Sequence, residues 1–221
     1  MRILIVSASY GADEWPNSPI ITGIADELCA MGHHLDFVAP KAHKPDADPP
    51  RNGYRVKRIH PLILREGTYA KFLKSLAFSA TAVPASLTLK RPDVVMTLSP
   101  PLTIGLTGAV LAKRWGVPCV YNVQDIYPDV LVEQGHMQTG SVPHRLMTEC
   151  ELLIYRRSTA VSVISPGHKD LLAAKGVPRD KLAVVPNYTD TEFVRPLPKD
   201  NPVSRRLGMH DRFTVMYAGN L

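Results

Sequence analysis

The polar residues with the clearest chemical potential lie in the segment from Gln124 to Asp129, which reads Gln-Asp-Ile-Tyr-Pro-Asp. The segment follows a strongly apolar run at residues 119–123. The Asp125 carboxylate can accept hydrogen bonds from sugar hydroxyls, and the Gln124 amide can both donate and accept. A second interpretation is structural, because Asp125 or Asp129 could cap the helix that follows. The residues alone leave both interpretations open.

Two other segments place a serine before a proline after an apolar run. Ser165–Gly167 has the pattern of a helix N-cap with proline at the first helical position. Ser99–Pro101 resembles it, with Thr103 as the expected cap. A helix start is the plainer interpretation of both. Each start could also hold an anion, because the first backbone N–H groups of a helix have no intrahelical partner.

Two common nucleotide-binding patterns are absent from the sequence. The segment after the first apolar run, Ser7–Trp15, contains one glycine, so it has no G-x-G-x-x-G motif for a pyrophosphate. The second expected strand does not end in an acid for a ribose, and no G-x-x-x-x-G-K-[ST] motif occurs. The sequence therefore argues against an NAD-type dehydrogenase and against a P-loop protein.

The cysteines and histidines show no metal-binding pattern. Cys29, Cys119 and Cys150 are odd in number and far apart, and no pair has C-x-x-C spacing. Cys29 and Cys119 have apolar neighbours, which predicts buried structural thiols. The histidines are dispersed and lack an H-E-x-x-H motif, so surface or capping roles are expected for them. The sequence predicts neither a bound metal nor a resident cofactor.

Composition places the chain among globular proteins, with 221 residues of which 45% are hydrophobic. The formal net charge is +6, but the basic residues come singly or in pairs and do not alternate with aromatic residues. This pattern argues against a nucleic-acid partner and leaves a solvated surface or an anionic membrane face. No apolar stretch approaches the ~18–20 residues that a membrane span needs. A soluble, cytoplasmic protein is the expectation.

The elements that must position these residues alternate between short apolar runs and longer helical patterns. Strands are expected at residues 3–7, 35–39, 54–59, 94–98, 119–123, 160–164, 182–185 and 213–217. Helices are expected at residues 19–31, 69–89, 103–115, 143–157, 167–175 and 202–207. This alternation predicts an α/β fold, a Rossmann-like parallel sheet with helices on both faces. Ligands of such sheets bind beyond the carboxyl ends of the strands.

One expected helix, Tyr69–Leu89, carries an apolar stripe. The stripe comprises Tyr69, Phe72, Leu73, Leu76, Ala80, Val83 and Leu87, with Lys71 and Lys74 outside it. A helix that packs on the sheet through this stripe is the plain interpretation. A membrane-facing amphipathic helix is the sharper one, although Pro84 would kink or end the helix.

The prolines and strand patterns also predict the domain organisation. Residues 1–186 are expected to form the Rossmann-like domain, and residues 187–211 are expected to be an interdomain linker. Residues 212–221 read as the first strand of a second domain that is otherwise missing from the chain.

Several segments, in this order and spacing, resemble one family. They are A-M-G-H-H-L (30–35), V-Q-D-I-Y-P-D (123–129), S-V-I-S-P-G-H-K-D-L-L (162–172), V-V-P-N-Y-T-D-T-E-F-V-R-P (184–196) and V-M-Y-A-G-N-L (215–221). The chain resembles the N-terminal domain of family 4 glycosyltransferases, which have the GT-B fold. It is most similar to the branch that builds bacterial exopolysaccharide, capsule and O-antigen, including colanic-acid-type enzymes.

The resemblance implies an enzyme with two Rossmann-like domains that face each other across a cleft. The N-terminal domain mainly holds the acceptor, and the C-terminal domain holds most of the nucleotide-sugar with a pair of glutamates and basic residues. Transfer in this family is retaining and needs no bound metal, because preorganised charges stabilise the departing diphosphate. The glutamate pair is expected beyond Leu221.

The resemblance also assigns expected site residues. Gln124 and Asp125 occupy the position of a His-Asp pair that contacts the transferred sugar in many members, so both are expected to be catalytic residues, and the glutamine is a departure. Trp15 and Pro16 stand where the family often has a Gly-Gly or Thr-Gly pair near the donor phosphates. The residues expected to bind substrate are Asn17, Ser18, Ser99, Ser165, Asn187, Gly219 and Asn220.

The resemblance thus predicts a retaining, nucleotide-sugar-dependent glycosyltransferase that adds a hexose to a lipid-linked or saccharide acceptor in cell-surface polysaccharide synthesis. Its partners would be the nucleotide-sugar, the acceptor, the inner face of the plasma membrane and a separate C-terminal domain, with no nucleic acid. The chain alone is expected to fold but to lack transferase turnover. The alternative is a noncatalytic module that binds an acceptor or a partner, as a remnant or as half of a split enzyme.

Overall fold

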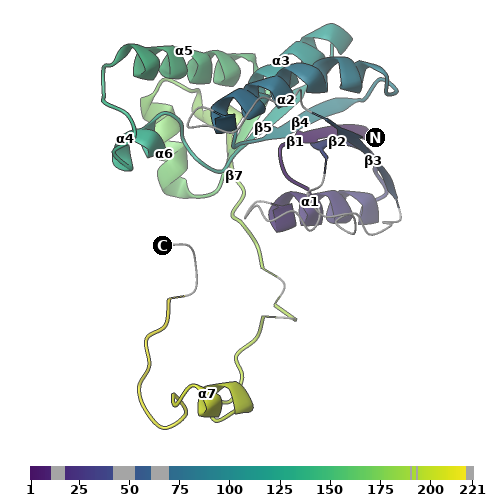
Figure 1. Cartoon of the computed structure of the whole chain (residues 1–221). Helices are drawn as coiled ribbons and strands as arrows, with labels where there is room; N and C mark the ends of the chain where they lie inside the picture. Colours follow the sequence, from purple (N-terminus) through teal and green to yellow (C-terminus); the bar gives the residue numbers. More distant parts are fainter. Residues whose placement is uncertain (11–17, 42–52, 61–69, 190, 193, 218–221) are drawn as a thin grey trace. The chain divides into compact units, whose positions relative to one another are not determined.

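The computed structural model describes residues 1–10, 18–41, 53–60, 70–189, 191–192 and 194–217 (Figure 1). The chain divides into two compact units, the sheet unit Met1–Asn187 and the C-terminal unit Tyr188–Leu221. The predicted division into an acceptor-side domain, a linker and the start of a second domain stays a prediction.

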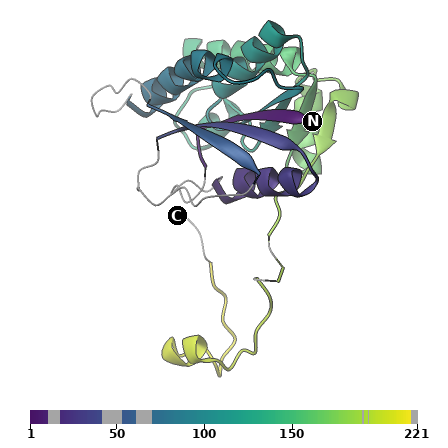
Figure 2. The ribbon, with the colours of Figure 1, turned by 90° about the vertical axis from the view of Figure 1, so that its right-hand side faces the viewer.

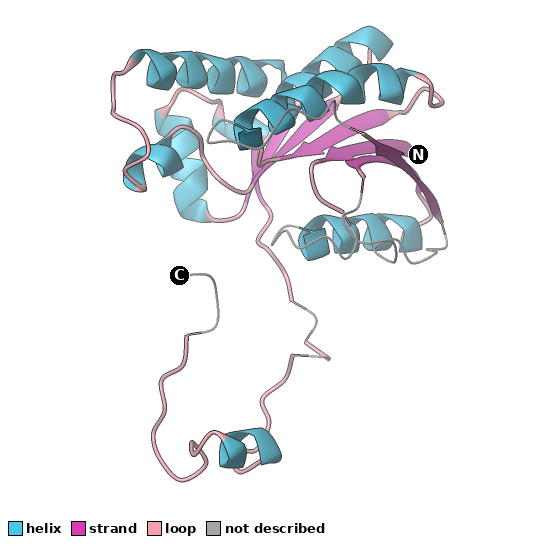
Figure 3. Cartoon of the chain, in the orientation of Figure 1, coloured by secondary structure: helices cyan, strands magenta, loops and turns pink. Residues whose placement is uncertain are grey.

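The described part of the sheet unit contains a seven-stranded, all-parallel sheet (Figure 3, magenta). Its spatial order is β3-β2-β1-β4-β5-β6-β7. The strands are β1 (Arg2–Ser7), β2 (His34–Pro40), β3 (Tyr54–Ile59), β4 (Val94–Leu98), β5 (Cys119–Val123), β6 (Ala160–Val163) and β7 (Leu182–Val184). The predicted Rossmann-like α/β fold is confirmed, since each of these strands lies within about a residue of its predicted range.

Helices cover both faces of this sheet, as predicted. They are α1 (Ser18–Ala30), α2 (Ala70–Leu87), α3 (Ile104–Trp115), α4 (Asp129–Glu133), α5 (Val142–Arg157) and α6 (Pro166–Ala174), with a short 3₁₀ turn at Arg179–Lys181. In both ribbon views α2, α3 and α5 lie on one face and α1 lies on the other (Figures 1 and 2). This placement follows from right-handed crossovers, because the chain moves in opposite directions from β1 to β2 and from β4 to β5.

The core consists of two hydrophobic clusters, one on each face of the sheet. Successive residues of β1 alternate between them: Ile3 and Ile5 belong to the cluster under α1, and Leu4 and Val6 belong to the cluster under α2, α3 and α5. Side chains of a strand point to opposite faces, so a strand covered on both sides must be apolar throughout. This explains why the strands read as continuous apolar runs.

Two glycines let helix α3 lie close to its neighbours, Gly105 against α5 and Gly108 against β4. A Cβ on Gly105 would stand 2.5 Å from Ile154 Cγ2, and a Cβ on Gly108 would stand 2.9 Å from Thr97 Cγ2. Contacts this short cannot be accommodated without moving the core. The helix ends at Gly116 with φ 65°, and the Gly116 N–H donates to the Ala112 carbonyl, which is a left-handed helix C-cap.

The buried face of α2 differs from the predicted stripe. Phe78, Ser79, Ala82 and Ser86 are buried, whereas the stripe residues Leu73, Leu76, Ala80 and Leu87 are exposed. Helix α2 therefore packs on the sheet as predicted, but of the stripe residues whose side chains are described only Val83 lies against the core. Tyr69 lies outside the described residues, and the helix continues through Pro84.

Hydrogen bonds to α3 explain which face of α2 turns inward. The Ser79 Oγ lies 2.8 Å from the Thr103 Oγ1, and the Thr107 Oγ1 donates to the Ser79 carbonyl at 2.8 Å. A small hydroxyl residue lets the two helices approach, and its polar atoms are satisfied within the contact. Apolarity alone does not reveal such a face.

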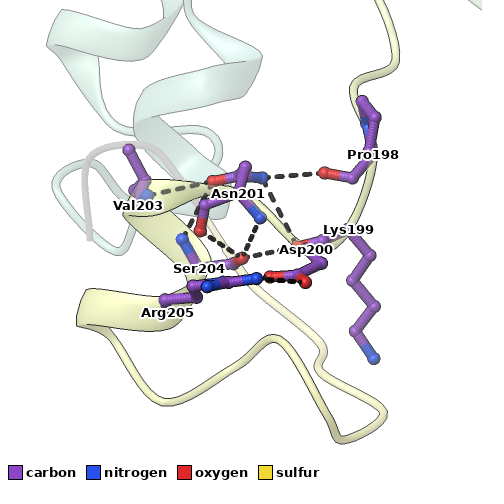
Figure 4. A network of polar contacts seen from close by, with 7 residues as sticks. All are labelled: Pro198, Lys199, Asp200, Asn201, Val203, Ser204 and Arg205. Atoms are coloured by element: carbon purple, nitrogen blue, oxygen red, sulfur yellow. Dashed lines mark hydrogen bonds and ion pairs between the residues drawn. The ribbon is translucent and has the colours of Figure 1, made fainter.

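The C-terminal unit contains one short described helix, α7 (Pro202–Arg206), with a complete cap (Figure 4). The Asn201 Oδ1 accepts from the Ser204 N–H at 3.0 Å, and the Ser204 Oγ accepts from the Asn201 N–H at 3.0 Å. This reciprocal pair is a capping box. Residues 213–217, expected as the first strand of a second domain, are unpaired and exposed in this chain. Their role in a second domain stays a prediction.

Candidate functional site

The carboxyl ends of the central strands bring several predicted site residues together. Leu98 pairs with Asn122, and Val123 pairs with Val163, in parallel register. The residues that follow these strands therefore reach the same edge of the sheet. Ser99 and Gln124 contact each other there, and Ser165 follows β6 at the same edge, as predicted from their positions after the strands.

The Gln124 side chain is buried and engaged at both ends. Its Nε2 donates to the Asn122 Oδ1 at 2.6 Å, and its Oε1 accepts from the Asn187 Nδ2 at 2.8 Å. The Asn122 Nδ2 in turn donates to the Ser162 Oγ at 2.9 Å. Gln124 thus links β5, β6 and the last residue of the sheet unit in one polar chain.

Asn122 and Ser162 were not among the predicted site residues. Both are buried in the middle of otherwise apolar strands, where an unpaired polar side chain would be costly. A polar residue inside a fully covered strand is the sequence signal that could have identified them. The partners themselves could not be found without knowing that β5 and β6 are neighbours.

Ser99 and Ser165 have structural partners. The Ser99 Oγ accepts from the Gln124 N–H at 3.1 Å, so it fixes the backbone where β5 ends. The Ser165 Oγ accepts from the His168 N–H at 3.2 Å and caps α6, with Pro166 as the first helical residue. The expected N-cap at Ser165 is present. Thr103 precedes α3 but makes no side-chain cap hydrogen bond.

Asp125 stands next to this network, and its carboxylate is half-buried. Burial raises the pKa of Asp125, and the nearby His168 acts in the opposite direction. Burial also raises the pKa of the Tyr127 phenol, and the Asp125 charge adds to that rise.

The helix-cap interpretation of Asp125 and Asp129 is wrong. Pro128 occupies the N-cap position of α4, and no side chain caps this helix. Asp129 instead forms an ion pair with Lys175, which also donates to the fully buried Glu151 at 2.8 Å. This cluster ties α4, α5 and α6 together behind the Asp125 turn.

The other residues predicted to bind substrate are Asn17, Ser18, Gly219 and Asn220. Ser18 is buried in the first turn of α1, and its Oγ has no hydrogen-bond partner among the described residues. Asn17, Gly219 and Asn220 lie outside the described residues. None of the substrate-binding assignments is tested by this geometry, so they stay predictions.

In the described ranges, no group of three or more His, Cys, Asp or Glu side chains is arranged to hold a metal ion. The three cysteines are free, with Cys119 buried and Cys29 and Cys150 partly buried. Burial raises the pKa of the Cys119 thiol to about 11, so this thiol is protonated at neutral pH. Cys119 is a buried thiol as predicted, and Cys29 is less buried than predicted.

The sequence matches a known protein family over most of the sheet unit. Residues 18–188 match the family model of the glycosyl transferase 4-like domain. The chain belongs to this family. It is 26% identical over 112 residues to the probable glycosyltransferase WbjE of Pseudomonas aeruginosa, a match that covers 51% of this chain and 28% of the relative.

Solved structures agree on the fold of this glycosyl transferase 4-like chain. Sucrose-phosphate synthase from Thermosynechococcus elongatus superposes with a TM-score of 0.67 at 17% identity, covering 91% of this chain and 54% of that one. HepE from Anabaena, in complex with UDP and glucose, gives 0.61 at 14% identity, covering 96% and 52%. The chain thus spans about half the length of these structures.

Among the helices within the described ranges, none is both long enough and apolar enough to cross a bilayer.

Proposed function

We propose that this chain is the acceptor-side part of a retaining, nucleotide-sugar-dependent glycosyltransferase. The enzyme adds a hexose to a lipid-linked or saccharide acceptor in cell-surface polysaccharide synthesis, at the cytoplasmic face of the plasma membrane. The chain alone does not complete the transfer. The observation that carries the proposal is the half-buried Asp125 carboxylate at the carboxyl edge of a glycosyl transferase 4-like sheet.

The chemistry of Asp125 suits a sugar. An ionised carboxylate only accepts hydrogen bonds, and sugar hydroxyls donate them. Partial burial strengthens such bonds because less water competes for the oxygens. The hydrogen bonds of Gln124 to Asn122 and Asn187 hold the neighbouring backbone in place. Gln124 therefore acts as a positioning residue, and Asp125 contacts the sugar.

The donor in this proposal is a nucleotide-sugar. The fold shared with HepE, whose structure holds UDP and glucose, supports this class of donor. The reaction as proposed uses no resident cofactor or metal. Fixed positive charges and backbone N–H groups stabilise the departing diphosphate, and most of them belong to a C-terminal domain that acts together with this chain.

The outer face of α2 supports an acceptor at a membrane surface. Leu73, Leu76 and Leu87 are 40%, 44% and 42% exposed on one helix. Lys74 is exposed next to Leu73 on α2. Lys113 is exposed in the last turn of the neighbouring helix α3. An apolar stripe with flanking lysines is the pattern of a helix that lies on an anionic bilayer.

Binding and turnover of the 221-residue chain test the proposal separately. Isothermal titration with a short polyprenyl diphosphate hexose should detect binding, and Asp125→Asn should weaken it about ten-fold, the loss of one charge-assisted hydrogen bond. Asp180→Asn is the matched control, because Asp180 is exposed in the 3₁₀ turn and should bind as the wild type does.

Transfer from UDP-glucose or GDP-mannose to the same acceptor should be undetectable with the chain alone. Robust transfer by the chain would contradict the need for a second domain. Binding that is absent, or equally strong in Asp125→Asn, would contradict the acceptor site. A protein that binds neither saccharide nor nucleotide-sugar would favour the noncatalytic module.

A further inference from the structure

The amino edge of the sheet, at the other end of the strands from the candidate site, carries a cluster of charged side chains. Arg2 pairs with His34, and Asp36 pairs with Arg55, in the parallel register of β1, β2 and β3. Paired residues and residues two positions apart share a face of a sheet, so these four lie on one face. It is the face that α2 covers, because the next residues along it belong to the cluster under α2, α3 and α5.

Two arginines share one buried carboxylate at this edge. The Asp36 side chain is 5% exposed, and its Oδ2 accepts from the Arg2 Nη1 at 3.3 Å. Its Oδ1 accepts from the Nε and Nη2 of Arg55 at 3.1 and 2.9 Å. A buried carboxylate needs a counter-charge, and one guanidinium would supply it. Each guanidinium has five N–H donors, so most donors of the two arginines are not used by Asp36.

A depression of about 390 Å³ is lined by both arginines and Asp36, together with His34, Leu35, Gly53, Tyr54 and Lys90. Its volume is within the range of roughly 300–1,000 Å³ that is typical of small-molecule sites. Lys90 follows α2, is exposed, and has no hydrogen bond or ion pair with the described part of the chain. Three cations thus line the depression with one carboxylate, which leaves an excess of positive charge.

Neighbouring acceptors do not cancel this excess. The carbonyl groups at the end of α2 carry partial negative charge, but the Lys57 Nζ donates to the Ala85 carbonyl at 3.1 Å and also to the Thr88 Oγ1. The Asp93 carboxylate accepts from the Arg2 backbone N–H at 2.7 Å and does not line the depression. The positive charge of the depression is therefore available to an anionic ligand.

We propose that this depression binds the phosphate group of a small soluble ligand through Arg2, Arg55 and Lys90. A phosphate group presents several acceptor oxygens and up to two negative charges, which suits cations that converge from three elements. Guanidinium groups match phosphate oxygens in geometry. Because Asp36 already holds both arginines, they lose little conformational freedom when a ligand binds. The site is separate from Asp125 and does not depend on the proposed function.

Titration of the 221-residue chain with inorganic phosphate tests the site. Backbone amide NMR at constant ionic strength, with glycerol 3-phosphate as a second probe, should show saturable shifts confined to the residues that line the depression. Constant ionic strength matters because general attraction between exposed charges is screened by salt. Shifts spread over all basic surfaces, or shifts that do not saturate, would overturn the inference.

Single variants test which cations hold the phosphate. Arg55→Met and Lys90→Met should each weaken phosphate binding about ten-fold, the loss of a charge-assisted contact. Arg145→Met removes the same charge from an exposed position on α5 and should bind phosphate as the wild type does. Equal affinity of all three variants would show that net charge alone attracts the anion, which would overturn the inference.

Two further variants keep the test decisive. Arg55→Lys retains the charge beside Asp36 but not the fork of donors, so it replaces Arg55→Met if that variant does not fold, and it should bind phosphate more weakly than the wild type. Asp125→Asn should bind phosphate as the wild type does, because Asp125 lies at the other edge of the sheet. A loss of phosphate binding in Asp125→Asn would place the anion at the candidate site and overturn the inference.

Discussion

At the scale of single residues, the two predicted catalytic side chains have different roles. Gln124 is buried and its amide is used within the protein, whereas Asp125 is half-buried and accepts no hydrogen bond from the described residues. A side chain whose hydrogen bonds are satisfied internally can orient a site but has little capacity left for a ligand. Under the proposed function, the ligand contact therefore falls to Asp125.

The ion cluster behind the site leads to a prediction about stability. Glu151 has a side chain exposure of 0%, and Lys175 is its charged partner. Lys175→Met should destabilise the fold by about 3 kcal/mol at pH 7, because it leaves a buried carboxylate without a counter-charge. Chemical denaturation of both chains measures the difference.

The pH dependence of this loss has a defined sign. Burial raises the pKa of Glu151 and Lys175 opposes the rise, so removing Lys175 raises that pKa further. An acid with a raised folded pKa loses stability as pH increases from its ordinary value of 4.5. The Lys175→Met deficit should grow above that pH and shrink below it. Arg179→Met, which breaks an exposed pair with Asp170, should cost less than about 1 kcal/mol at either pH.

At the scale of elements, the two faces of α2 differ in character. One face makes hydrogen bonds to α3 through Ser79, and the other exposes leucines. Monomeric proteins rarely expose a continuous apolar stripe without a binding role. Under the proposed function, the outward leucines contact the membrane surface.

This face predicts binding to lipid vesicles. The 221-residue chain should sediment with vesicles that contain anionic phosphatidylglycerol, and the double change Leu73→Glu and Leu76→Glu should weaken the binding about ten-fold by removing buried apolar area. Met31→Glu is a control, because Met31 is 71% exposed and follows α1 on the opposite face. Equal sedimentation of both variants would show that α2 is not the contact.

Element positions could be predicted from the sequence, and their faces and partners could not. Apolar runs bounded by glycine or proline mark covered strands, which is why β1, β4 and β5 were located correctly. Residues 213–217 have the same pattern but do not form a strand, because a strand exists only when it is paired. The five-residue helix α4 carries too little periodicity to be recognised.

At the candidate site too, the positions of residues along the chain could be predicted, but their spatial partners could not. The carboxyl-edge rule located Ser99, Asp125 and Ser165 without a structure. It could not show that Asn187 donates to Gln124, a contact across 63 residues of sequence.

At the scale of the whole molecule, both hydrophobic clusters lie within the sheet unit. A chain that ends at Thr189 keeps both clusters and the Asn187 hydrogen bond to Gln124. Its melting temperature should therefore lie within about 2 °C of that of the full chain, since stability follows the buried core. Circular dichroism of the two chains measures this, and a substantial drop would show that residues 190–221 stabilise the sheet unit.

The strand order also affects how the chain folds during synthesis. β1 is central, and its two neighbours are β2 and β4. β2 leaves the ribosome soon after β1, but β4 follows only after roughly 90 further residues, which is on the order of 5–20 seconds of translation. During that interval one edge of β1 has no strand to pair with, and unpaired edges invite association with other chains. The β1–β4 pairing has the longest sequence separation in the described sheet, and it joins β2 and β3 to the strands that lead to Asp125.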